Sequence, residues 1–85
     1  MHFVKFERHY CNVLQITSIQ MYKIENRKND YRIVFHFDNG NYQNWDLPDI
    51  PDLEHANLLL ETAVIRLADW PFKSNVITID ELAGK

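Results

Sequence analysis

The chain has 85 residues, 46% of them hydrophobic and 13% aromatic, and it carries a formal net charge of −3. This length is that of a single domain, residues 1–85, and the apolar content is too high for a disordered chain. The mild acidity argues against non-specific binding to nucleic acid or to anionic lipid, because both need clustered Lys and Arg side chains.

Cysteine content and apolar runs indicate the compartment. Cys11 is the only cysteine, so the chain cannot form an internal disulfide, which fits a reducing compartment. The N-terminal stretch 1–10 carries charges and lacks the apolar core of a secretory signal. The longest apolar runs, 58–60 and 63–65, are far shorter than the roughly 20 residues of a membrane helix. We therefore expect a cytoplasmic protein with no membrane contact.

The N-terminal part of the chain is predicted to be extended. β-favouring side chains predict a short strand over 2–6 and a second extended stretch over 13–25. Within that stretch the period of two breaks near Thr17-Ser18, which predicts a β-bulge. The most polar run of the chain, 26–30, is typical of a solvated loop.

A hairpin is predicted next. Apolar and polar side chains alternate over 31–37, which makes this the clearest strand. The Asn39-Gly40 pair that follows is the strongest local hairpin signal. A two-residue turn at this pair would set Phe35 opposite Asn44 and place polar groups on the core face.

The alternative hairpin is a three-residue loop over 38–40 with its glycine in the left-handed conformation. This register pairs Ile33 with Trp45 on the core face and sets Arg32 opposite Asp46 on the outer face. Cross-strand partners decide which register is stable, so we predict the three-residue loop.

A long amphipathic helix is predicted after the hairpin. Pro51 suits a first helical turn, Asp49 or Asp52 can cap it, and Pro71 ends the helix by Trp70. One apolar stripe is expected to pack on the sheet. Its members are Leu53, Ala56, Leu59, Leu60, Ala63, Val64, Leu67 and Trp70.

The C-terminal segment is predicted to hold a strand over 76–79 and a frayed polar tail over 80–85. The expected order is therefore β-β-β-β-α-β. It predicts an α+β domain in which a four-stranded antiparallel meander is packed by one long amphipathic helix, with a short C-terminal strand in addition.

Leu58 and Ile65 do not fit the apolar stripe of the helix. They are seven residues apart, so they lie nearly in line, and they fall among acidic side chains such as Glu61. Scattered exposed hydrophobes are normal, and the N-terminal strand or the segment 71–79 could cover these two. The functional interpretation is a partner or self-association surface rimmed by carboxylates.

Metal and catalytic signals are weak. His9 and Cys11 form an H-x-C pair, but zinc needs three or four ligands, and we expect no metal or cofactor. Cys11 as a nucleophile would need a base such as His36 or His55 beside it. Four carboxylates near the helix start could support acid–base chemistry, but capping is the simpler interpretation. These are Asp46, Asp49, Asp52 and Glu54.

The sheet face away from the helix is the alternative site. In the predicted register it carries Arg32, Val34, His36 and Tyr42. Sheets that bind RNA display aromatic side chains for base stacking, but they usually add basic residues and a Gly-aromatic consensus that this sequence lacks. The alternative function is therefore the binding of a small molecule or nucleic acid on this face.

Part of the sequence resembles a group of short bacterial and phage proteins. The shared features are a short first strand, the pattern Asn12-x-x-x-Ile16-x-x-Ile19, an Asn-Gly hairpin and a C-terminal helix. In these features the chain is similar to the small flagellar-motility proteins of the FlbD type, over about half its length. The segment 70–85 departs from that pattern, and no functional residue follows from the resemblance.

These observations favour a non-enzymatic module of a small intracellular protein. The expected partner is another protein or a second copy of the chain, in a homodimer, and nucleic acid is not expected. The contact would be made by Leu58 and Ile65 or by a sheet edge.

Overall fold

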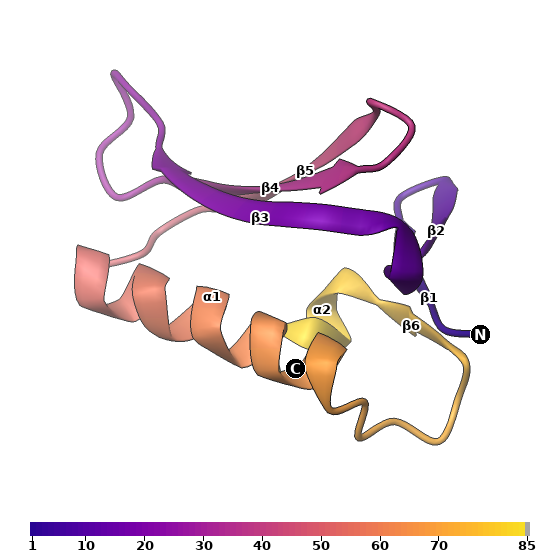
Figure 1. Cartoon of the computed structure of the whole chain (residues 1–85). Coiled ribbons are helices and arrows are strands. Elements are labelled where there is room, and N and C mark those ends of the chain that lie inside the picture. Colours follow the sequence, from indigo (N-terminus) through magenta and orange to yellow (C-terminus); the bar gives the residue numbers. More distant parts are fainter. Residues whose placement is uncertain (85) are drawn as a thin grey trace.

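A computed structural model describes residues 1–84 as two three-stranded sheets and one long helix (Figure 1). The first sheet has the strand order β2-β1-β6 and the second sheet β3-β4-β5. The α+β class is confirmed, whereas the single four-stranded meander is wrong. The elements are β1 (Phe3–Phe6), β2 (His9–Asn12), the 3-10 helix η1 (Val13–Gln15), β3 (Ile16–Lys23), β4 (Tyr31–Phe37), β5 (Tyr42–Leu47), α1 (Leu53–Ala68), β6 (Val76–Thr78) and α2 (Ile79–Leu82).

The meander is broken because the chain turns twice before β3. β1 and β2 form an antiparallel hairpin that pairs Val4 with Cys11, and Glu7 in its turn has a positive φ of 48°. The Asn12 side chain then accepts a hydrogen bond from the Leu14 amide at 3.0 Å and starts η1. This Asn-initiated turn carries the chain from the first sheet to the second. The predicted stretch 13–25 is therefore strand only over β3.

The second sheet has the predicted hairpin. Ile33 pairs with Trp45 and Arg32 with Asp46, and Gly40 has a φ of 84°, so the three-residue loop is confirmed. The shift in pairing between Ile16 and Ser18 confirms the β-bulge. These outcomes follow from the need to bury one face of β4.

The C-terminal segment returns to the first sheet. β6 pairs in parallel with β1, setting Ile77 beside Val4. α2 then begins with a capping box made by Thr78 and Glu81, and Leu82 is completely buried. The prediction of a frayed tail is wrong for residues 80–84, because Ile79 and Leu82 lie on one face of α2 and pack into the core. Lys85 lies outside the described residues.

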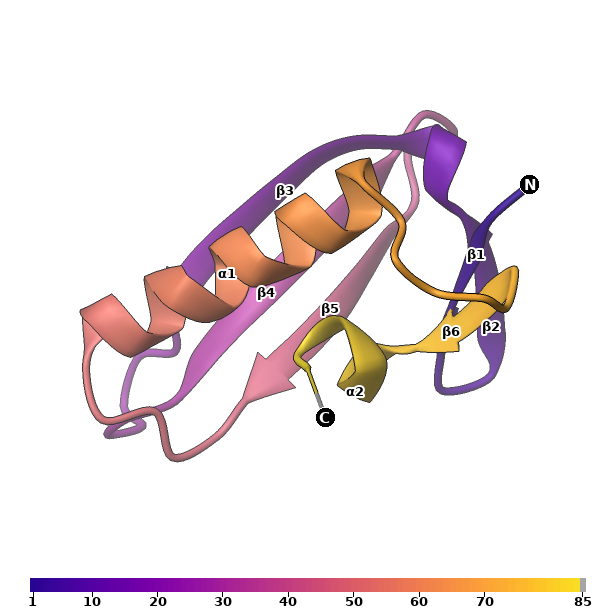
Figure 2. The same cartoon turned by 90° about the horizontal axis from the view of Figure 1, so that it is seen from below.

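The helix α1 packs beneath the second sheet (Figure 2). Asp52 caps it by accepting a hydrogen bond from the His55 amide at 2.9 Å, so Pro51 precedes the helix instead of opening it. Ala56 and Ala63 are completely buried. Small side chains at this contact let the helix backbone approach the sheet closely.

The prediction of the apolar stripe is wrong for two of its members, because α1 packs on the sheet through Ala56 and Ala63. Leu53 is 57% exposed and Val64 is 42% exposed, so neither packs fully on the sheet. Both lie roughly 60–100° around the helix from the buried alanines, at about 100° per residue. Leu59, Leu60 and Leu67 are partly buried as expected.

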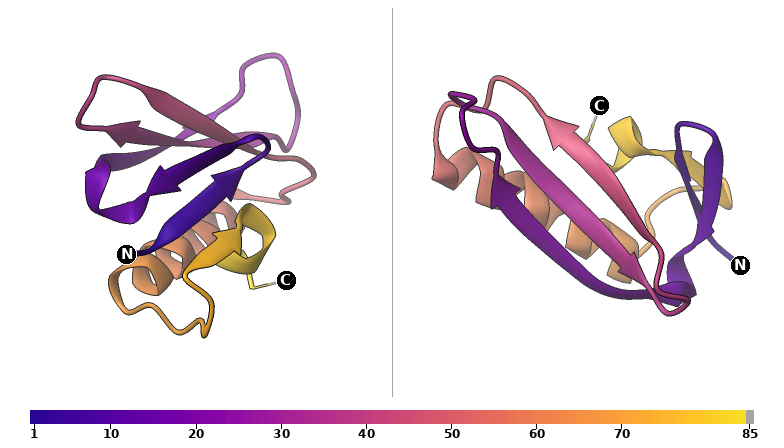
Figure 3. Two further views of the ribbon diagram at one scale, coloured as in Figure 1. Left: turned by 90° about the vertical axis from the view of Figure 1, so that its right-hand side faces the viewer. Right: turned by 90° about the horizontal axis from the view of Figure 1, so that it is seen from above.

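The two sheets share one core where the first sheet meets one end of the second (Figure 3). The Phe6 ring lies edge-on to Phe35, with ring centroids 5.0 Å apart. At the periphery, Trp70 stacks on His2 at 4.2 Å and donates from its indole nitrogen to the Ser74 carbonyl. Within residues 1–84, no helix combines the length and apolar character needed to cross a bilayer.

The buried end of α2 gives a test of the fold. Leu82→Ala removes a fully buried side chain and should lower the free energy of unfolding by about 2–5 kcal/mol. Urea unfolding followed by circular dichroism measures this loss. Asp80→Ala, at an exposed position of the same helix, is the control and should change the free energy of unfolding by less than about 0.5 kcal/mol. An equally small effect of Leu82→Ala would mean that α2 is not part of the core.

Candidate functional site

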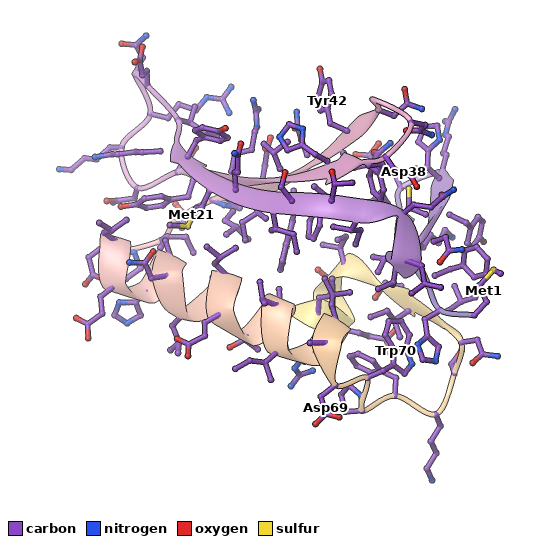
Figure 4. The ribbon with its side chains drawn as sticks, viewed as in Figure 1. Met1, Met21, Asp38, Tyr42, Asp69 and Trp70 are labelled. Carbon is purple, nitrogen blue, oxygen red and sulfur yellow. The ribbon has the colours of Figure 1, made fainter. Side chains whose placement is uncertain are left out.

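The open face of the second sheet carries a shallow hollow. Arg32, Val34, His36 and Tyr42, which the sequence placed on this face, all line it. Tyr42 points away from α1 in Figure 4, and this side of the sheet has no helix over it within residues 1–84. The structure therefore brings the predicted group together.

The one arginine that lines this hollow is paired with a carboxylate. Arg32 makes a two-pronged contact with Asp46, with Nε–Oδ1 at 2.6 Å and Nη2–Oδ2 at 3.3 Å. Hydrogen bonding and charge from Arg32 lower the pKa of Asp46, and the same contact raises the pKa of Arg32. Because this guanidinium is already bound, it is poorly placed to hold a phosphate.

Aromatic surface is what the hollow offers a ligand. Tyr42 and Tyr22 are both at least half exposed, and the rings of His36 and Tyr42 lie 6.4 Å apart. Val34 is buried and lines the hollow as well. Such a surface can stack a flat ring and offer phenolic hydroxyls as hydrogen-bond partners.

The second candidate surface is the ridge formed by Leu58 and Ile65 on α1. Leu58 is 62% exposed and Ile65 is 55% exposed, so within the described chain neither the N-terminal strand nor the segment 71–79 covers them. A shallow depression beside Leu58 is lined by Glu54, His55, Asn57 and Glu61. The ridge is thus an apolar line with an acidic margin.

The carboxylates near the helix start do not converge on one site. Asp52 accepts hydrogen bonds from the backbone amide of His55 and contacts its Nδ1 at 2.7 Å. This contact lowers the pKa of Asp52 and raises the pKa of His55. Asp46 instead faces Arg32, and Asp49 lies in a turn with a φ of 58°. The geometry supports capping at Asp52 and gives no paired carboxylates for acid–base chemistry.

The H-x-C pair lies on β2 of the first sheet. His9 is exposed, Cys11 is partly buried, and burial raises the pKa of the Cys11 thiol. A raised pKa disfavours the thiolate, which is the nucleophilic and metal-binding form. Among residues 1–84, no three His, Cys, Asp or Glu side chains gather as metal ligands.

Sequence reasoning missed five residues that line the hollow, Tyr22, Lys23, Ile24, Glu25 and Asn44. Tyr22 lies opposite Arg32 in the β3–β4 pairing, and Asn44 lies opposite Val34 in the β4–β5 pairing. The predicted hairpin register already implied the position of Asn44. Tyr22 needed the β3–β4 register, which the bulge near Ser18 conceals in the sequence.

Comparison with known proteins gives no relative. The chain matches no family model, no curated protein and no solved structure. The resemblance to FlbD-type proteins therefore has no support from these comparisons.

The pair formed by Asp52 and His55 predicts a pH dependence. The pKa of His55 is raised above its ordinary 6.5, so its contribution to stability is full below that value and is lost as pH rises through the folded pKa. The pKa of Asp52 is lowered below its ordinary 3.8, so its contribution is full above that value and is lost as pH falls through its folded pKa. Stabilisation from the pair is therefore greatest between these two ranges.

Thermal unfolding at a series of pH values measures this effect. In the wild type, Tm should fall slightly as pH rises above about 6.5. The His55→Gln variant should lack this fall, although its backbone amide at position 55 can still bond to Asp52. Because both side chains are exposed, added salt should shrink the difference between the two proteins. Parallel pH profiles in low salt would contradict the prediction.

Proposed function

We propose that the chain is a non-enzymatic, cytoplasmic protein-interaction module that binds a partner through the ridge formed by Leu58 and Ile65. The observation that carries this proposal is the exposure of these two large aliphatic side chains, each more than half accessible, on one line of α1. Seven residues of helix separate them, so they present two anchors about 10 Å apart.

The margin of the ridge indicates the kind of partner. Glu54 and Glu61 flank the depression beside Leu58. A complementary surface would hold an apolar groove for the two anchors and basic side chains at its rim. This is the helix-in-groove mode of recognition, in which residues one or two turns apart supply the anchors.

The hollow on the open sheet face favours a second candidate function, the binding of a small flat molecule or of single-stranded nucleic acid. It supports stacking through Tyr22 and Tyr42. It ranks below the ridge because Arg32 is engaged by Asp46 and the chain is acidic overall.

The ridge proposal predicts the effect of a double substitution. Leu58→Glu with Ile65→Glu should abolish the complex with the partner, because a charged side chain in an apolar groove costs several kcal/mol. The fold should remain intact, since both positions are exposed. Affinity capture from the native host, followed by identification and titration of the captured protein, measures the loss.

Lys28→Glu is the matched control for this double variant. It lies in the exposed loop between β3 and β4 and changes the net charge by the same two units. It should retain the partner. If the double variant binds as well as Lys28→Glu does, the ridge is not the binding surface.

The second candidate predicts local changes in the NMR spectrum of the open face. A panel of nucleobases and short oligonucleotides should shift the signals of Tyr22, His36 and Tyr42, and Tyr42→Ala should weaken binding by about 1–3 kcal/mol through lost stacking. Tyr10→Ala, an exposed tyrosine on the first sheet, is the control. A spectrum that no member of the panel changes would remove this candidate.

A further inference from the structure

The outer edge of β3 is the longest free strand edge in the part of the chain that the structure describes. β3 has eight residues and ends the strand order β3-β4-β5 (Figure 3). The edge strands of the first sheet, β2 and β6, have four and three residues. The edge of β5 instead borders a groove that it shares with Phe6, Glu7, Ile79 and Asp80.

The backbone groups on the β3 edge are free to pair. The Ile24 amide donates to the Asp30 carbonyl at 3.0 Å, so this pair closes the β3–β4 hairpin with a hydrogen bond. Antiparallel ladders alternate, so beyond the bulge the even-numbered residues Ser18, Gln20 and Tyr22 bond to β4. Ile19, Met21 and Lys23 therefore direct their N–H and C=O groups outward.

This edge lacks the features that usually prevent edge-to-edge pairing. Exposed strands are normally protected by a central charge, a proline or a mid-strand bulge. From Ile16 to Tyr22 the strand has no charged residue, glycine or proline. Its bulge lies at the start, near Ser18, and its one charge, Lys23, lies at the end.

An apolar strip continues from the edge onto α1. Ile19 and Met21 are partly buried on the helix side of β3, and Figure 4 shows Met21 pointing toward α1. Arg66 reaches from α1 to the Glu81 carbonyl of α2 at 2.8 Å, which identifies the flank of the helix nearer β5. The opposite flank therefore lies below the β3 edge (Figure 2).

That opposite flank carries the two side chains left exposed when α1 docked on its alanines. Val64 is one residue beyond Ala63, on the side away from Arg66, and Leu53 lies in nearly the same direction. Both are exposed, and the partly buried Leu60 lies between them and the sheet. The side chains of Ile19, Met21, Leu60, Val64 and Leu53 are all apolar.

We propose that β3 pairs antiparallel with β3 of a second copy about a two-fold axis at Gln20, to form a six-stranded sheet. In this register Ile19 lies opposite Met21 of the other copy, and Lys23 lies opposite Thr17. Both hydrogen-bonding groups of Ile19 and Met21 are then satisfied, and no like charges face each other. A register centred on Met21 is shorter and sets Lys23 against Ile19.

Two properties select a second copy as the occupant of this surface. The antiparallel edge is complementary to itself in hydrogen bonding, and the strand is uncharged where two identical charged strands would repel. The pairing would also bring the two exposed flanks of α1 toward each other beneath the joined sheet and bury Val64 and Leu53. This inference goes beyond the ridge proposal, because it uses a different surface.

A disulfide trap tests the register. In a Cys11→Ser background, Gln20→Cys should form an intermolecular disulfide in most of the protein under mild oxidation. The two Gln20 positions form a non-hydrogen-bonded pair whose Cβ atoms lie roughly 4.5–5.5 Å apart, close to disulfide geometry. Ser18→Cys, on the same face of the same strand, is the control and should stay reduced, because it lies opposite Tyr22. Equal cross-linking of both variants, or of neither, would overturn the proposal.

Hydrogen exchange on the wild-type chain gives an independent test that needs no substitution. The Ile19 and Met21 amides should exchange at least about tenfold more slowly at high than at low protein concentration. The outward amides of β5 at Tyr42, Asn44 and Asp46 should show no such dependence. Rapid, concentration-independent exchange at Ile19 and Met21 would refute the pairing. Repeating the trap in the Leu58→Glu, Ile65→Glu chain separates the two proposals, because loss of the ridge should leave the β3 disulfide unchanged.

Discussion

The edge-on packing of the Phe6 ring against Phe35 and Phe37 joins two sheets that are each too small to hold a core alone. The ring centroids lie 5.0 and 6.4 Å apart. Short three-stranded sheets need a packed apolar face to be stable, and Phe6 brings the face of the first sheet against the second. The parallel return of β6 and the burial of Leu82 in α2 complete that shared core. The C-terminal segment is therefore structural, even though its sequence is mostly polar.

A second constraint, the docking of α1 on Ala56 and Ala63, determines which surfaces remain available. Because the two smallest apolar side chains of the stripe make the central contact, the helix lies close to the sheet and its larger side chains are displaced to the flanks. One flank meets α2 through Arg66, and the other is left with Val64 and Leu53 exposed. The exposure of the β3 side thus follows from the same contact that stabilises the domain.

The sequence predicted correctly those elements that a strong local pattern defines, namely the β4–β5 hairpin and α1. Alternation in β4, together with the need to bury Trp45, identified the hairpin register, and Asp52 with Pro71 bracketed α1. The strand β2 was missed because His9–Asn12 has no apolar alternation; its pairing with β1 depends on a turn at Glu7. Likewise, the pairing of β6 with β1 joins residues more than 70 positions apart, and no local pattern encodes it. For the site, the four open-face residues were identified, whereas Tyr22 required the β3–β4 register.

The two proposed surfaces, the ridge on α1 and the edge of β3, differ in chemistry, and that difference favours a different proposed partner for each. A two-fold contact between ridges would bring the Glu61 side chains of both copies near each other on chains that are already acidic, so charge would oppose self-association through the ridge. The β3 edge has no such opposition, since its central residues are uncharged. If two copies join at β3, each keeps its ridge exposed, and the dimer presents two identical helix surfaces to a basic-rimmed partner. A partner with two such grooves would then bind with an avidity that neither ridge provides alone.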